Sequence, residues 1–355
     1  MLIKYLEIFF ISCIAGWVFS IIGIPLPWTL GPLVTVIILE NYFKREVFWQ
    51  VRFRSIGMLF LGYVMGSPFN METCIYILEH LEIILLMTFV TIIVSLLGGV
   101  IVNRFTGVSL ATSLIGSIPG GLSQMAIVSE EIKESDPTAV ILMQTVRVLT
   151  TVSVIPFLVL YGLSSSFESV ARSVYPFVLN DIPQLGIFAV VIGLTSYLTQ
   201  RFSIPGRYIV VPIIVTAILI ICGVKAPPMP SVVTAVAQIL VGIGMGKSIN
   251  LFSLSNWKKI VGLNFLNVLV VIGILFSIDY FYTKLYNLDL ITMFISTAPG
   301  GIAEMGLTAM MVHADLAMVI SFQLFRMLFV LLVGIPILKW VLNRRTRIRE
   351  LDMKN

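Results

Sequence analysis

An internal duplication constrains the fold of this chain more than any other feature. The sequence Pro119-Gly120-Gly121 recurs 180 positions later as Pro299-Gly300-Gly301. Scarce prolines far from this motif keep the same offset: Pro25 with Pro205, Pro32 with Pro212, and Pro156 with Pro336. Corresponding Gly/Pro interruptions in two copies are typical of the binding site of a secondary transporter. We predict one repeat over 1–175, a second over 180–345 and a basic cytoplasmic tail over 346–355.

The composition excludes a water-soluble globule. Apolar residues make up 58% of the chain and charged residues 12%, and the mean hydropathy is +1.03. Apolar runs such as 83–102, 261–278 and 316–338 are long enough to cross a hydrocarbon core about 30 Å thick. The chain is therefore predicted to be an all-α polytopic membrane protein. Its first span starts close to residue 1 without a cleavage site, so we expect that span to be retained.

The charges of the loops bear on the topology. If each Pro-Gly-Gly element crosses the membrane, the repeats have six spans and are parallel; if it dips in and returns, they have five and are inverted. The basic residues between apolar segments occupy different loops in the two halves: Lys44, Arg45, Arg52 and Arg54 in the first, and Arg201, Arg207, Lys247, Lys258 and Lys259 in the second. With the N-terminus inside, the inverted arrangement places nearly all of them in the cytoplasm. We predict two inverted repeats of about five transmembrane helices, each with a Pro-Gly-Gly re-entrant hairpin; a spanning broken helix is the alternative.

A Pro-Gly-Gly turn at mid-membrane could bind a ligand. The amides at the start of the following half-helix suit an anion, and freed carbonyls suit a small cation; a kink that only helps packing is the alternative. The copies differ where Gln124 corresponds to Glu304. An ionisable residue at that depth is a candidate for carrying a coupling H⁺ or binding Na⁺, or it caps its own half-helix. The hydroxyls of Ser123, Ser117 and Thr297 could be further ligands, or these small polar residues only help helices to pack.

A second set of polar residues is repeated on the long apolar segment that ends each half: Asp136, Gln144 and Arg147, and then Asp315, Gln323 and Arg326. Their spacing places each set within about 80° on one helix face. Each arginine could grip a carboxylate in bidentate fashion or bridge carbonyls of the hairpin. We expect the Gln–Arg pairs to line the cavity and the aspartates to be N-caps.

The duplicated Pro-Gly-Gly-(Leu/Ile)-x-(Gln/Glu)-Met unit, with its downstream Gln-x-x-Arg, resembles the AbrB family of bacterial membrane proteins. The resemblance covers nearly the whole chain and implies two AbrB duplication domains in the bacterial cytoplasmic (inner) membrane. Members are often labelled regulators of gene expression or ammonia monooxygenases. With only His80 and His313, the chain offers no copper site built on imidazoles. The layout is also similar to citrate and glutamate symporters with paired re-entrant loops, which is an analogy of fold.

We therefore expect a non-enzymatic, ion-coupled secondary transporter of a small solute, favouring an organic anion. The alternative is a membrane sensor that affects gene expression indirectly. The expected partners are the lipid bilayer, a small solute and, by analogy, a second copy of the chain, with no direct nucleic-acid contact, no metal and no cofactor besides coupling H⁺ or Na⁺. Both termini are expected in the cytoplasm. The predicted binding residues are Pro119, Gly120, Gly121, Ser123, Gln124, Pro299, Gly300, Gly301 and Glu304, with Gln144, Arg147, Gln323 and Arg326 lining the cavity.

Overall fold

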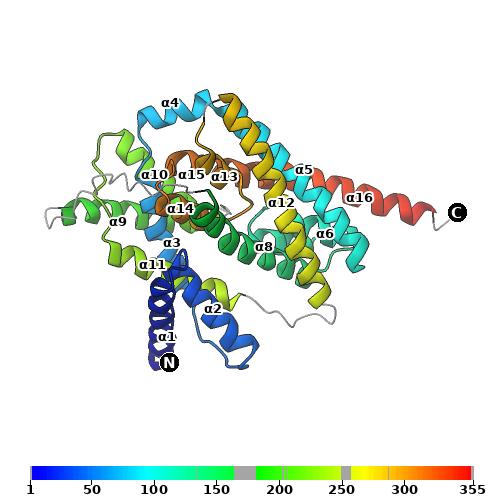
Figure 1. Ribbon diagram of the computed structural model, residues 1–355, viewed down its shortest axis with the longest axis horizontal. Helices are drawn as coiled ribbons and strands as arrows, with labels where there is room; N and C mark the ends of the chain where they lie inside the picture. The colour runs from blue at the N-terminus through cyan, green and yellow to red at the C-terminus, as the bar shows by residue number, and fades with distance from the viewer. Residues whose placement is uncertain are drawn as a thin grey trace. The chain divides into compact units, whose positions relative to one another are not determined.

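The computed structural model describes residues 2–132, 134–163, 181–201, 204, 206–248, 257–286 and 288–352. Within these ranges the chain forms helices and no strands (Figure 1). Six helical segments are long and apolar enough to cross a membrane: Lys4–Ile21, Leu81–Thr106, Pro137–Leu163, Ile182–Arg201, Trp257–Tyr286 and Leu316–Leu342. Large apolar side chains on these segments, such as Phe10 and Trp17, are exposed, as a surface that faces lipid requires. The protein is thus an all-α polytopic membrane protein, as predicted.

Helices in the two halves begin at matching positions. The first half forms α1 (Leu2–Ile21), α2 (Pro27–Asn41), α3 (Val51–Gly66), α4 (Met71–Glu79), α5 (Leu81–Thr106), α6 (Leu110–Ser117), α7 (Leu122–Glu130) and α8 (Pro137–Phe157). The second half forms α9 (Ile182–Leu198), α10 (Arg207–Ile221), α11 (Ser231–Lys247), α12 (Trp257–Tyr286), α13 (Leu290–Thr297), α14 (Ile302–Met311), α15 (Leu316–Phe329) and α16 (Ile335–Asp352). The starts of α2, α3, α6 and α7 recur at α10, α11, α13 and α14 with an offset of 180.

Local sequence explains several of these boundaries. Leu26 and Gly206 precede α2 and α10 with left-handed φ values of 48° and 60°, so the chain turns sharply at the same place in each half. The side chains of Ser109 and Asp289 accept hydrogen bonds from the backbone at the starts of α6 and α13, as N-caps do. Proline disturbs the last helices, because π-helical segments at Leu158–Leu163 and Val330–Gly334 lie beside Pro156 and Pro336.

The chain divides into two compact units, and each takes segments from both halves. Unit 1 comprises Met1–Leu81, Val152–Asn250 and Ile302–Ile320. Unit 2 comprises Glu82–Thr151, Leu251–Gly301 and Ser321–Asn355. The units therefore cut across the sequence repeats, because α1–α4 and α9–α11 group together while α5–α8 group with α12, α13, α15 and α16.

In unit 1, glycines let helices of opposite halves approach closely. A Cβ added to Gly62 of α3 would lie 2.8 Å from the carbonyl oxygen of Ile209 in α10. A Cβ added to Gly242 of α11 would lie 2.5 Å from that of Thr29 in α2. One turn further along the helices, the same close approach of a glycine to a carbonyl oxygen recurs between Gly66 and Ile213 and between Gly246 and Leu33. These contacts give the four glycines a role in helix packing. Each half supplies glycines against the backbone of the other half, which is the pattern expected of copies related by a two-fold axis.

In unit 2, the first Pro-Gly-Gly hairpin is packed in an apolar cluster. Ile115, Ile118 and Met125 of the hairpin are buried with Val140 of α8 and Val330. The long helices α5 and α12 lie side by side (Figure 1), and a Cβ added to Gly98 would overlap the Asn267 side chain, 2.0 Å from Oδ1. This close approach brings polar residues of α12 next to the hairpin.

Some elements differ from the sequence-based expectation. Helices α2, α3, α10 and α11 have 15 to 17 residues, or roughly 22–26 Å, so each is shorter than an average hydrocarbon core. Helix α4 was not predicted. Arg54 was assigned to a loop but lies in α3, because that helix begins at Val51. The segment 346–352, predicted as a tail, continues α16 as helix.

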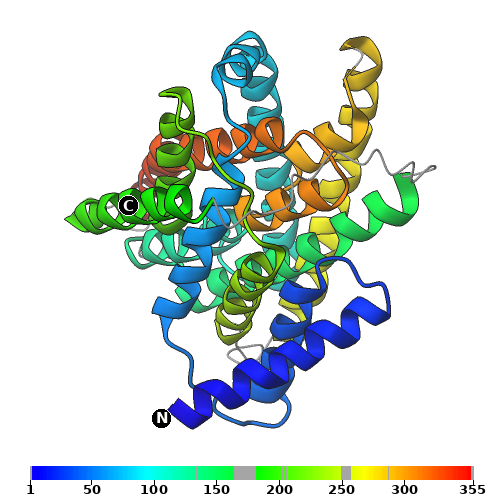
Figure 2. The same ribbon diagram turned by 90° about the vertical axis from the view of Figure 1, so that its left-hand side faces the viewer.

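The arms of the first hairpin are too short to cross a membrane. Helices α6 and α7 contain 8 and 9 residues, or roughly 12–14 Å each. Figure 2 shows the short orange helices of the second copy, α13 and α14, joined by their turn. The re-entrant path of these hairpins and the inverted relation of the repeats stay predictions.

Candidate functional site

The two Pro-Gly-Gly turns have the same backbone geometry. Helix α6 ends at Ser117 and α13 at Thr297. In the first turn the Gly120 amide donates to the Ile118 carbonyl across Pro119, at 2.8 Å, and in the second Gly300 donates to Ala298 across Pro299, also at 2.8 Å. Both turns are therefore tight three-residue turns centred on proline, which has no amide to satisfy. Pro119, Gly120, Pro299 and Gly300 are buried, whereas Gly121 and Gly301 are partly exposed.

Side chains of α8 hold the first turn. Gln144 donates from Nε2 to the carbonyl oxygens of Ile115 and Ile118, at 2.9 Å each. Arg147 donates from Nη1 to the same Ile118 oxygen at 2.6 Å. These carbonyls belong to the end of α6 and the turn, where no helical amide follows to donate to them. The buried Gln144 and Arg147 thus satisfy the backbone that the turn leaves open.

Side chains of α15 hold the second turn more extensively. Gln323 Nε2 lies 3.1 Å from each of three carbonyl oxygens, those of Ile295, Ser296 and Ala298. Arg326 donates from Nη1 to Thr297 at 3.1 Å and Ala298 at 2.6 Å, and from Nη2 to Gly300 at 2.8 Å. Gln323 Oε1 also accepts from Arg326. The contacts favour bridging of hairpin carbonyls over a bidentate grip on a free carboxylate, because both Nη atoms of Arg326 are occupied.

We call each pair of glutamine and arginine that holds a turn a Gln–Arg clamp. The expected N-caps are confirmed at the starts of α8 and α15, the helices that carry the two clamps. Asp136 Oδ1 accepts from the Thr138 amide at 2.9 Å. Asp315 Oδ1 accepts from the Met318 amide at 3.1 Å. Each aspartate therefore belongs to the helix start rather than to the Gln–Arg clamp.

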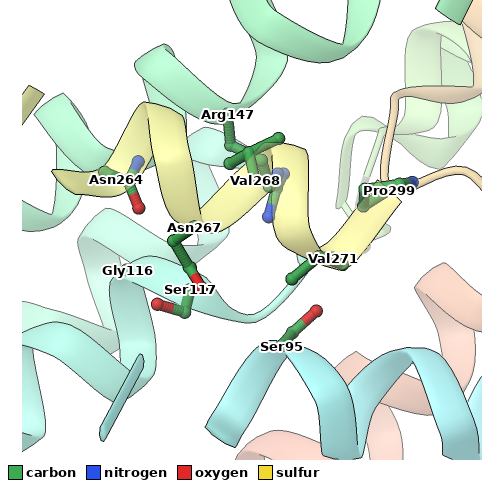
Figure 3. A pocket seen from close by; sticks show the side chains of 9 residues that line it. All are labelled: Ser95, Gly116, Ser117, Arg147, Asn264, Asn267, Val268, Val271 and Pro299. Carbon is green, nitrogen blue, oxygen red and sulfur yellow. The ribbon is translucent and has the colours of Figure 1, made fainter. Parts of the chain in front are cut away.

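A small cavity in unit 2 lies beside the turns (Figure 3). Its polar side chains come from α5, α6, α8 and α12: Ser95, Ser117, Arg147, Asn264 and Asn267. Gly116, Pro299 and two valines of α12 complete the lining. Its free space is on the order of one water molecule. Both hairpins contribute, the first through Gly116 and Ser117 at the end of α6 and the second through Pro299 of its turn.

The cavity is rich in hydrogen-bond donors. Ser117 is buried, and its hydroxyl has no hydrogen-bond partner among the described residues. Asn264 donates from Nδ2 to the Met143 carbonyl of α8 at 2.7 Å. This hydrogen bond fixes the orientation of the Asn264 side-chain amide. The guanidinium groups of Arg147 and Arg326 repel each other electrostatically. Two buried like charges in one unit favour a negative or electron-rich group near Arg147.

Glu304 has a different environment from the turns. It is the third residue of α14, is 6% exposed and belongs to unit 1. Its electrostatic partner in that unit is Arg54 of α3, a helix that contacts α14. The stem of Arg54 passes over Gly244, where an added Cβ would lie 2.7 Å from Arg54 Cβ. Glu304 is therefore opposed by a basic residue that was predicted to lie in a loop.

Most of the predicted residues belong to one compact unit. Pro119, Gly120, Gly121, Pro299, Gly300, Gly301 and both Gln–Arg pairs belong to unit 2, whereas Glu304 belongs to unit 1. The side chains of Ser123 and Gln124 lie outside the described residues. Sequence reasoning missed Ser95, Asn264 and Asn267. The two asparagines, three residues apart in an apolar run and hence on one helix face, were the signal that could have found them.

Comparisons with known proteins show which family the chain belongs to. Residues 28–342 match the family described as "Transition state regulatory protein AbrB". The chain belongs to the AbrB family. It is 25% identical to "Uncharacterized protein YhjN" of Bacillus subtilis (strain 168), over 93% of this chain and 91% of that protein. It is 23% identical to "Putative regulator AbrB" of Escherichia coli (strain K12), over 91% of this chain and 92% of that protein. The AbrB resemblance proposed from the Pro-Gly-Gly motifs is thereby confirmed.

Proposed function

We propose that this AbrB-family protein is an ion-coupled secondary transporter of a small solute, with a small organic anion favoured. The observation that carries the proposal is the cavity of unit 2, in which Ser117, Arg147 and Asn267 meet beside Pro299 of the other turn. A site assembled from corresponding interruptions of two copies is the arrangement that secondary transporters use. We also propose a location in the bacterial cytoplasmic membrane with both termini inside.

The chemistry of the lining favours an anionic or polar solute. A guanidinium, two primary amides and two hydroxyls face the cavity, and its lining contains no carboxylate. Arginine and amide donors suit carboxylate oxygens. The space fits one small group, so a solute would enter with a carboxylate or hydroxyl first, or the cavity would widen in another state of the transport cycle.

A regulatory role is the second candidate, and the printed name of the Escherichia coli relative favours it. The two candidates are compatible if regulation follows from movement of a solute. A regulator that moves no solute would have to pass a signal through a partner at the membrane surface. Neither candidate involves direct contact with nucleic acid, a metal or catalysis, and a homodimer is compatible with both.

The decisive test measures binding and then transport. Purified protein would be melted in detergent with small mono- and dicarboxylates over a range of pH and Na⁺ concentrations. We expect at least one carboxylate to raise the melting temperature of the wild type, and Ser117→Ala and Asn267→Ala to weaken that shift. Ser277→Ala is the matched control, because Ser277 is exposed on α12 and donates to the backbone carbonyl oxygen of Gly273 within its own helix.

Transport would then be measured in proteoliposomes with the stabilising carboxylate. Uptake that depends on a pH or Na⁺ gradient supports the transporter. Glu304→Gln would test whether that acidic residue takes part in coupling. No stabilisation by any solute, with both cavity variants melting like wild type, would contradict the transporter and favour the regulator.

A further inference from the structure

Asp279 is a buried acidic residue that the binding cavity does not use. It lies within α12, and its side chain is 0% exposed. Its Oδ2 accepts a hydrogen bond from Thr297 Oγ1 at 2.6 Å. Its Oδ1 is buried and has no hydrogen-bond partner among the described residues. One hydroxyl donor does not replace the hydration of a carboxylate, so this environment favours the protonated carboxylic acid.

The first copy shows that the hairpin can be built without this acid. The residue 180 positions before Asp279 is Gly99, and the residue 180 positions before Thr297 is Ser117. A Cβ added to Gly99 would lie 3.0 Å from Ser117 Oγ, so the two positions are neighbours in both copies. The first turn nevertheless has the same tight geometry and the same Gln–Arg clamp. The carboxyl group is therefore an addition to the second hairpin and not a requirement of its fold.

Asp279 is connected to the second turn through Thr297. Thr297 is the last residue of α13, and its carbonyl oxygen accepts from Arg326 Nη1 at 3.1 Å. The same guanidinium holds Ala298 and Gly300. A negative charge on Asp279 would therefore arise one residue away from the cation that holds the turn, and it would alter the balance of those bonds.

The other charged groups near this site lie on neighbouring elements. Helix α13 has no ionisable side chain between Leu290 and Thr297. The elements that contact α12 or α13 carry Glu82 and Arg104 on α5, Arg147 on α8 and Arg326 on α15. On α12 itself, Lys284 and Tyr280 are exposed and interact with each other. A proton needs one free carboxylate oxygen, which Oδ1 supplies, whereas a metal cation needs several oxygen ligands.

We propose that Asp279 binds a proton, and that gain or loss of this proton acts on the second hairpin turn through Thr297 and Arg326. Use of this proton for coupling rests on the transport function proposed above. The site belongs to the second copy alone, so the two hairpins would respond differently to pH.

Infrared spectroscopy of the full-length protein tests the proton directly. A protonated carboxyl in an apolar site gives a carboxylic-acid C=O band that is lost when the group ionises. We expect a carboxylic-acid band near neutral pH in wild type that is missing from Asp279→Asn, and we expect this difference to vanish as the pH rises and Asp279 ionises. Asp289→Asn is the matched control, because Asp289 is an exposed carboxylate at the start of α13; this variant should keep the band.

A second variant keeps the test decisive if the asparagine variant does not fold. Asp279→Gly reproduces the first copy and should also lack the band. A wild-type spectrum that matches both variants at every pH would overturn the proton site. Wild type that moves no solute in proteoliposomes would overturn the proposed transport, while the infrared result would still decide the proton site. Asp279→Asn that retains uptake with unchanged proton dependence would overturn the coupling role.

Discussion

At the scale of single residues, Arg54 and Glu304 carry opposite charges that attract each other, and their counterparts in the other half are both neutral. The residues 180 positions away are Thr234 and Gln124. If the pair interacts directly, replacing one member leaves the other charge poorly solvated, whereas replacing both does not. We expect Arg54→Thr and Glu304→Gln each to lower the stability, and the double variant to recover about 1–3 kcal/mol of the summed loss.

Melting temperatures of the four proteins in one detergent would measure this coupling. Arg52→Thr, at an exposed position of the same helix, should show no coupling with Glu304→Gln. Additive losses for Arg54 and Glu304 would mean that the two charges do not stabilise each other.

Arg326 offers a second test at this scale. Its two Nη atoms donate to three backbone oxygens of the second turn, a geometry that a single lysine ammonium cannot reproduce. We expect Arg326→Lys to destabilise the protein by about 1–3 kcal/mol, because at least one buried carbonyl loses its donor. Thermal melts would measure the loss beside Arg344→Lys, at an exposed arginine of α16. Equal melts for the two variants would contradict the clamp.

The sequence located these clamping residues but not what they hold. Repetition within apolar runs predicted Gln144, Arg147, Gln323 and Arg326. A guanidinium buried in an apolar run is costly unless it has hydrogen-bond partners or lines a cavity. Their partners are backbone carbonyls, which every residue has, so no pattern of side chains reveals them. Asp279 was not predicted, because it has no counterpart in the first copy and a repeat reveals only the residues that both copies share.

At the scale of helices, the glycine contacts of unit 1 predict a sharp contrast between positions. Gly62→Ala and Gly242→Ala would each place a methyl group against a backbone oxygen, at 2.8 Å and 2.5 Å. We expect each to destabilise the protein by about 1–3 kcal/mol. Gly193→Ala is the matched control on α9, because no atom lies within 4 Å of its added Cβ. Its higher helix propensity should leave the melting temperature unchanged or slightly raised.

The duplication explains how well the helices could be predicted. Proline and glycine end helices for steric reasons, so their recurrence fixed the breaks near residues 25, 119 and 205 as well as near 299. The short helix α4 escaped because nothing comparable in the second half was recognised.

At the scale of the whole molecule, the compact units do not follow the repeats. The first three helices of each half pack together in unit 1, where α3 lies against α10 and α11 lies against α2. The sequence revealed two copies, but it could not show that helices of one copy pack against helices of the other. Apolar helix faces of similar composition do not specify which copy they contact. Separate units that each combine both halves would suit the proposed transport, in which one unit moves against the other.

The orientation of the repeats can be tested with a native cysteine. Cys222 follows α10 and is exposed. The inverted arrangement places it outside the cell, whereas the parallel arrangement places it in the cytoplasm. In a Cys13→Ser, Cys74→Ser background, we expect a membrane-impermeant maleimide to label Cys222 in intact cells that lack an outer-membrane barrier. The control is Glu46→Cys in a background that also carries Cys222→Ser. Position 46 lies in a loop that is cytoplasmic in both arrangements, so it should be labelled only after permeabilisation. Labelling of Cys222 only after permeabilisation would replace the re-entrant hairpins with spanning broken helices.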